Sequence, residues 1–169
     1  METVSDEDFE SLARACKRAF HIEIADEYTV ESEAEHFRRF LSGEPDDYAW
    51  QADWANFVRE ATAAGTRFQR VRLVTEPHCD YTRWGLAVSP VNIAAGEDIR
   101  YLPRHLADGI DFPEDDFWLL DDDTLILSLF TPDGRTGYFS RSSSPELLSQ
   151  CIRVRDEAWK RAVPYAEYV

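Results

Sequence analysis

Residues 67–104, RFQRVRLVTEPHCDYTRWGLAVSPVNIAAGEDIRYLPR, decide the fold of this chain. The first eight residues have the β-branched and long side chains of a strand, and residues 99–102 form a second short strand. Between them, Asp80 is a suitable N-cap for a helical segment that contains Trp84 and is broken at Pro90. Strand, helix and strand in this order predict a β–α–β unit with parallel strands.

The flanking segments supply what this unit packs against. Apolar residues at helical spacing predict helices at residues 5–20, 50–64 and 144–163. The turn TPDG at residues 131–134 predicts a C-terminal hairpin. We therefore predict an α/β fold, with α+β as the alternative, built on a mixed sheet of about five to six strands with flanking helices. The chain is expected to be one domain, residues 1–169, with a helical extension at 1–48 and an α/β core at 49–169.

Composition limits the classes of partner. The chain has 169 residues, 44% hydrophobic content and a net charge of -15, and only residues 67–104 carry more basic than acidic side chains, six against four. Phosphate binding requires clustered cations, so the charge argues against direct nucleic-acid binding. A basic partner protein fits the acidic field better, although the acidic residues also serve solubility alone.

The sequence also predicts a cytoplasmic location. No apolar run reaches the roughly 20 residues that a membrane helix needs. The first ten residues, METVSDEDFE, lack the basic and apolar regions of a signal peptide. Cys16, Cys79 and Cys151 are widely spaced and form no CxxC pair, which is typical of free thiols in a reducing compartment.

No residue pattern predicts catalysis, a metal or a cofactor. His78 and Cys79 are sequence neighbours, and neighbours rarely have the geometry of a base and its thiolate. The histidines and cysteines lack zinc-ligand spacing, and the acidic run at residues 121–123 lacks the alternating oxygens and glycine of a calcium loop. Glycine-rich phosphate loops and the GxSxG elbow are absent.

A ligand site is expected at the carboxyl ends of the two parallel strands, because ligands of open α/β sheets bind there. Arg72 and Arg100 would lie deeper in the sheet, as structural ion-pair partners or as part of an anion site, and both interpretations stay open. The candidate ligand-binding residues are Arg72, Glu76, Tyr81, Arg83, Arg100 and Arg104.

The order of elements resembles one half of the phospholipase D-like fold. In that fold a strand bearing His-x-Lys is followed a few residues later by Asp, and the matching region here is residues 114–129, with Asp121 or Asp122 in the place of the Asp. The histidine and lysine are missing. A carboxylate cluster cannot replace them, because it cannot both attack and electrostatically hold a phosphodiester as an imidazole and an ammonium would. The positions before the strand are Glu114, Asp115, Asp116 and Phe117.

Five longer strings resemble the actinobacterial family called domain of unknown function 6879. They are RVRLVTEP, DYTRW, NIAAGEDIRYLPR, DFWLLDDDTL and RDEAWKRAVPYAEY, and the resemblance extends from the second predicted helix to the end. The family offers no catalytic or binding residues to carry over. Its members are often encoded near helix-turn-helix regulators, which implies a regulatory or partner-binding role.

Three functions follow as hypotheses. The first is a non-catalytic regulatory or protein-interaction module that works with a helix-turn-helix regulator. The second is a sensor that holds a small anionic ligand with Arg83 and Arg104. The third is a divergent phosphodiesterase-like enzyme. The sequence predicts no oligomeric state.

Overall fold

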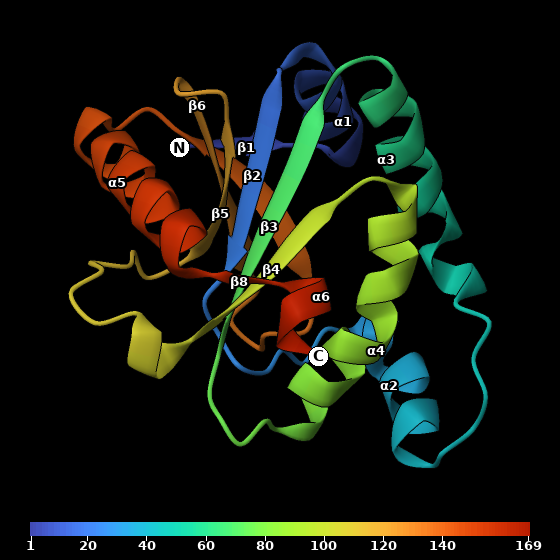
Figure 1. Cartoon of the computed structure of the whole chain (residues 1–169). Coiled ribbons are helices and arrows are strands. Elements are labelled where there is room, and N and C mark those ends of the chain that lie inside the picture. The colour runs from blue at the N-terminus through green and yellow to red at the C-terminus, as the bar shows by residue number, and fades with distance from the viewer.

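Three parallel strands, β2 (Arg18–Glu23), β3 (Arg67–Val74) and β4 (Asp98–Pro103), form the centre of the protein. The computed structural model describes all 169 residues (Figure 1). Helix α4 (Asp80–Ala95) connects β3 to β4, so the predicted β–α–β unit is present. Both strands are largely buried, as parallel strands covered on two faces should be.

The remaining strands complete an eight-stranded mixed sheet with the order β1-β7-β6-β5-β2-β3-β4-β8. This confirms the predicted mixed α/β class. The sheet has more strands than the five to six expected, because the short strands β1 and β8 are added at its two edges. Strand β5 pairs antiparallel with β2, and the β6–β7 hairpin follows. These strands are β1 (Glu2–Val4), β5 (Asp116–Leu120), β6 (Thr124–Phe130), β7 (Gly137–Ser142) and β8 (Val163–Pro164).

Residues 1–48 are not only a helical extension, because β1 and β2 belong to the sheet. Strand β2 lies between β5 and β3, near the sheet centre. Its apolar residues Phe20 and Ile22 face one side, whereas the buried side chain of His21 faces the other. The alternating sequence HIEI at residues 21–24 is typical of a short strand, and the structure places its polar residues on a buried face.

Helices cover both faces of the sheet (Figure 1). Helix α5 (Pro145–Arg161) packs its Cys151, Val154 and Ala158 on the face that carries Phe20 and Ile22. The other face is covered by α1 (Asp6–Ala15), α3 (Ala52–Ala63) and α4. No helix combines the length and the apolar character of a membrane span. The remaining helical elements are η1 (Glu31–Glu33), α2 (Ala34–Leu41), η2 (Ala49–Gln51), η3 (Arg104–Leu106) and α6 (Tyr165–Tyr168).

Pro90 does not break α4, contrary to the sequence-based expectation. A proline inside a helix leaves the carbonyl four residues earlier without its backbone donor. Here that carbonyl belongs to Leu86, and the hydroxyl of Tyr165 donates to it at 3.1 Å. The C-terminal segment therefore replaces the lost hydrogen bond, and α4 runs on to Ala95.

Candidate functional site

The face of the sheet beneath α4 is polar at its centre, where a core would ordinarily be apolar. His21 and Glu23 of β2 lie beside Arg70 and Arg72 of β3, since the register pairs His21 with Arg70 and Glu23 with Arg72. Apolar clusters flank this polar patch on the same face, one centred on Phe68 and one on Tyr101. Buried charges are costly unless they are paired, so the partners of these residues indicate whether the patch is structural or binds a ligand.

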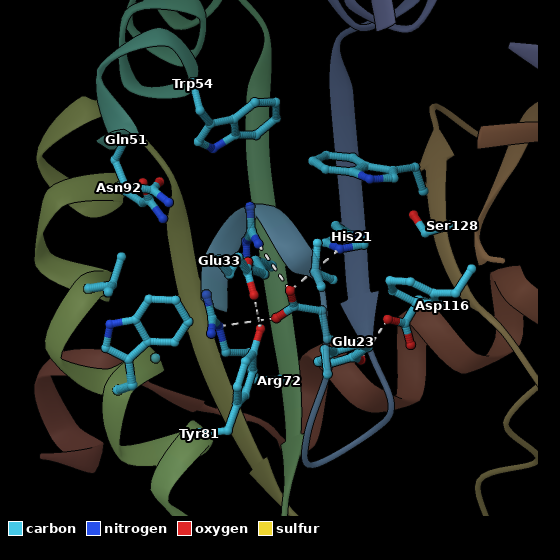
Figure 2. A pocket seen from close by; sticks show the side chains of 18 of the residues that line it. His21, Glu23, Glu33, Gln51, Trp54, Arg72, Tyr81, Asn92, Asp116 and Ser128 are labelled. Atoms are coloured by element: carbon cyan, nitrogen blue, oxygen red, sulfur yellow. Dashed lines mark hydrogen bonds and ion pairs between the residues drawn. The ribbon is translucent and has the colours of Figure 1, made fainter. Parts of the chain in front are cut away.

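The charges form an alternating chain. The indole N–H of Trp54 donates to Glu97 at 3.0 Å, and Arg70 bonds the same carboxylate at 2.9 Å. Arg70 also meets Glu23 at 3.3 Å, and Arg72 meets the other oxygen of Glu23 at 3.2 Å (Figure 2). Burial raises the pKa of Glu23, but Arg72 and Arg70 outweigh it and lower the pKa to about 2. Glu23 is therefore a saturated anion at the centre of the patch.

His21 is a neutral spacer in this chain. Burial and the nearby Arg70 lower its pKa to about 3. Its Nδ1 lies 2.9 Å from the carbonyl oxygen of Phe117, so the neutral ring carries its proton there and donates. The ring stacks on Trp118 with centroids 4.4 Å apart. His21 thus supports the wall of the site and has no spare proton to exchange near neutral pH.

A pocket of about 340 Å³ opens above the polar patch (Figure 2). This volume is at the lower end of the range for ligand sites, which is roughly 300–1,000 Å³. Its walls come from strands β2, β3, β5, β6 and β7, from helices α3 and α4, and from the segments around η1 and η2. Its aromatic lining comprises Tyr28, Trp50, Trp54, Tyr81, Trp84, Trp118, Phe130 and Phe139.

Two carboxylates of the pocket are held by tyrosines instead of cations. The hydroxyl of Tyr28 donates to Asp116 at 2.6 Å, and that of Tyr81 donates to Glu33 at 2.8 Å. Burial raises the pKa of Glu33, and it raises the pKa of Asp116 to about 7. Neither carboxylate has a basic side chain within ion-pair distance. We call Glu33 and Asp116, with their two tyrosines, the carboxylate wall.

Three buried polar atoms around the pocket have no hydrogen-bond partner. They are Nε of Arg72, Nε1 of Trp84 and Oδ1 of Asn92. Nε of Arg72 lies 3.2 Å from Oε2 of Glu23, which is an ion-pair contact without the geometry of a hydrogen bond. Trp84 and Asn92 are each only 3% exposed. An unpaired buried polar group costs about 1–3 kcal/mol, so the protein maintains unfilled hydrogen-bonding capacity at this place.

The pocket includes two of the six predicted ligand residues, Arg72 and Tyr81. Arg100 lies over the ring of Trp159, 3.8 Å from its centroid, on the face covered by α5. Glu76 is exposed and lies 3.9 Å from His105.

Arg83 and Arg104 are exposed and already paired. Arg83 donates to the carbonyl of His78 and contacts Asp80. Arg104 lies 3.2 Å from Asp26 and also donates to the carbonyl of Ile24. These arginines were expected to hold an anion, but they instead bind loop residues at the end of the sheet.

The aspartates that align with the phospholipase D-like pattern also have structural partners. Asp121 accepts the backbone N–H groups of Lys17 and Arg18, both at 3.0 Å. Asp122 contacts Arg155 of α5 at 2.5 Å. Neither lines the pocket, and no group of three His, Cys, Asp or Glu side chains has metal-binding geometry.

Sequence reasoning did not find Glu23, Glu33, Arg70 or Asp116 as site residues. One signal was present in β3, where Arg70 and Arg72 share a face with the apolar Phe68 and Val74. Charges on the buried face of a central strand need buried partners, and this points to a polar site. The paired carboxylates, Glu23 and Glu97, lie on β2 and directly after α4. The carboxylate wall comes from η1 and β5, and no local pattern connects these segments.

The fold and the pocket together define a mixed α/β domain with an aromatic-walled polar cavity on one face of its sheet. The family profile described as Domain of unknown function (DUF6879) matches residues 7–169. The chain therefore belongs to this family, and the match includes the strands and helices that build the pocket. A search of curated proteins finds no match.

Proposed function

We propose that the protein is a small-molecule-binding module that uses the pocket above Glu23 and Arg72 and serves a regulatory role. The observation that carries this proposal is the set of unpaired polar atoms of Arg72, Trp84 and Asn92 around one cavity. Natural proteins satisfy nearly all buried polar groups, and exceptions call for a specific explanation. A bound ligand that pairs with these atoms explains them.

This proposal keeps the ligand-binding hypothesis and moves its site. The cavity lies on the sheet face near the carboxyl ends of β2 and β3, beneath α4. Arg83 and Arg104 have protein partners and are not needed to hold a ligand. Aromatic walls with a few polar groups are typical of small-molecule sites. Three acidic and two basic side chains line the pocket, so an anionic ligand is not required.

A thermal-unfolding screen tests the proposal. The protein is heated with millimolar L-amino acids, amines, nucleosides, monosaccharides and carboxylic acids, each added singly. A ligand that binds only the folded state at 100 times its Kd stabilises it by about 2.7 kcal/mol. We expect at least one of these classes to raise the midpoint of unfolding. A panel without any shift in the wild-type protein contradicts the proposal.

A blocked pocket shows whether a shift comes from this site. Ser128→Trp puts a large side chain into the cavity from β6, and Ser149→Trp puts the same side chain on the exposed surface of α5. The thermal shift should disappear in the first variant and persist in the second. Gln51→Trp blocks the cavity from η2 and replaces Ser128→Trp if that variant does not fold. A shift that survives both blocking variants overturns the placement.

The sequence-based hypotheses of a protein-interaction module, a helix-turn-helix partner and a divergent phosphodiesterase stay predictions, as do an actinobacterial origin and the phospholipase D-like resemblance. The cytoplasmic location is a proposal that rests on the three unpaired thiols. The exposed large apolar residues are Met1, Leu41, Leu106, Tyr138 and Val169. They lie in separate elements, so no observation favours a docking surface over the pocket.

A further inference from the structure

Some carboxylates of the pocket have cationic partners, and others have none. Glu23 is saturated by Arg70 and Arg72. Asp116 is buried and Glu33 is half-buried. Glu33 accepts a hydrogen bond from the hydroxyl of Tyr81, and Asp116 accepts one from the hydroxyl of Tyr28 and one from the backbone N–H of Ile24. A buried carboxylate is far better stabilised by a cation than by neutral donors. The carboxylate wall thus lacks its cationic partners.

The two halves of the carboxylate wall are neighbours. The rings of Tyr28 and Tyr81 lie 5.7 Å apart, and each hydroxyl bonds one of the two carboxylates. Figure 2 shows Tyr81 pointing up to Glu33, with Glu23 and Arg72 close by. Arg72 forms an ion pair with Glu23 and none with Glu33, so its guanidinium is not the counter-ion of the carboxylate wall. The pocket therefore presents the carboxylate wall next to the guanidinium of Arg72, whose Nε makes no hydrogen bond.

We propose that the ligand is a small organic molecule with a protonated amine next to a hydrogen-bond acceptor, as in an α-amino acid. The amine binds the carboxylate wall, and the acceptor binds Arg72. An apolar or aromatic remainder packs on the tryptophans that line the cavity. This inference rests on the proposed function, because it names the ligand class for the same pocket.

Four phenyl compounds of similar size separate the chemistries: L-phenylalanine, phenethylamine, 2-phenylethanol and 3-phenylpropionate. Isothermal titration calorimetry measures the affinity of each for the full chain. We expect L-phenylalanine to bind tightest, and both amines to bind at least tenfold tighter than the alcohol and the acid. A charge-assisted hydrogen bond is about twice as strong as a neutral one, which supports a difference of this size. Equal or tighter binding of the alcohol or the acid overturns the inference.

Two matched variants locate the amine. Glu33→Gln removes the charge but keeps an acceptor for Tyr81, and we expect it to weaken binding of the amines tenfold or more. Glu31→Gln makes the same change two residues away, where Glu31 pairs with Arg135 outside the pocket at 2.9 Å, and should leave the affinities unchanged. If Glu33→Gln fails to fold, Tyr81→Phe keeps the charge of Glu33 and should keep the preference for amines. An amine preference that persists in folded Glu33→Gln overturns the assignment.

The outcomes also separate this inference from the proposed function. Binding of a nucleoside, sugar or carboxylic acid in the thermal screen, without binding of amines, overturns the ligand class and leaves the pocket as a ligand site. Absence of binding in both the screen and the phenyl series overturns both.

Discussion

Gly85 of α4 lies directly against the guanidinium of Arg72, so that a Cβ atom at position 85 would be 2.5 Å from Nη1 of Arg72. Real Cβ atoms essentially never approach another atom so closely, and Gly85 is fully helical and buried. The glycine therefore leaves room for an arginine between the sheet and the helix. This contact constrains the position of the Arg72 guanidinium beside the pocket.

Gly85→Ala should reduce ligand binding more than it reduces stability. Alanine gains up to about 1 kcal/mol in a helix interior relative to glycine, and this gain offsets part of the clash. The clash itself moves the far end of Arg72, a side chain that can turn. We expect a change in unfolding free energy within about 1 kcal/mol and a marked loss of affinity, measured by denaturation and by calorimetry. Unchanged affinity contradicts a role for Arg72 in binding.

Glu23→Gln should destabilise the fold strongly. Removing one partner of a buried ion pair leaves the other charge uncompensated, at a cost of about 3–5 kcal/mol. Here two arginines, Arg70 and Arg72, lose their common carboxylate. Urea denaturation measures the loss. Glu35→Gln is the control, because its ion pair with Arg38 is on the exposed surface and should contribute little; equal effects of the two substitutions would refute the buried network.

Asp116 gives the fold a specific pH dependence. An unfolded aspartate titrates near 3.9, whereas burial raises the pKa of Asp116 to about 7 in the folded protein. The folded state thus binds more protons between about pH 4 and pH 7, and the contribution of this group to stability falls as the pH rises through that window. The loss is complete above about pH 7.

His21 acts in the opposite direction, so Asp116 must be isolated by difference. The pKa of His21 is lowered to about 3, and its contribution rises between about pH 3 and the unfolded value near 6.5. We therefore compare the unfolding free energies of the wild-type protein and Asp116→Asn from pH 4 to pH 7. The wild-type protein should lose stability relative to the variant as the pH rises, by at most about 1.4 kcal/mol per pH unit. Parallel curves would show that Asp116 titrates normally.

Arg83→Ala and Arg104→Ala should leave ligand affinity unchanged. Both side chains are exposed, and neither lines the pocket. Arg104→Ala removes contacts with Asp26 and Thr75, so faster amide exchange in the loop around residues 24–26 is its expected effect. Calorimetry with a compound that binds the wild-type protein tests the pair. A large affinity loss in either variant would indicate that the ligand binds at the carboxyl ends of the strands and not in the pocket.

Local patterns were enough to predict the central unit of the fold. The strand at β3, the helix that begins at Asp80 and the strand at β4 each have a recognisable hydrophobic pattern. The N-cap of the helix is Cys79, one residue before the Asp80 that we predicted. Pro90 shows the limit of such reasoning, because the hydroxyl that rescues its helix comes from Tyr165, 75 positions further along the chain. Local sequence predicts a break at Pro90, and the tertiary contact with Tyr165 prevents it.

The site was harder to predict than the fold, since its charges come from distant segments. Arg72 and Tyr81 are on the β–α–β unit and were candidates for that reason. Glu23 belongs to a strand whose buried face is polar, and Glu33 belongs to a single 3₁₀ turn without an apolar period. Only the parallel pairing of β2 with β3 shows that Glu23 and Arg72 are partners.

The most direct test of the binding pocket uses the indole N–H signals of the five tryptophans in a ¹⁵N-correlated NMR spectrum. Trp50, Trp54, Trp84 and Trp118 line the cavity, whereas Trp159 packs on the opposite face against Phe20. Titration with L-phenylalanine, or with a compound that raises the unfolding midpoint, should shift the pocket signals, with Trp84 moving most because its N–H is unpaired. The signal of Trp159 should stay in place. Stationary pocket signals, or a shift confined to Trp159, would contradict the account.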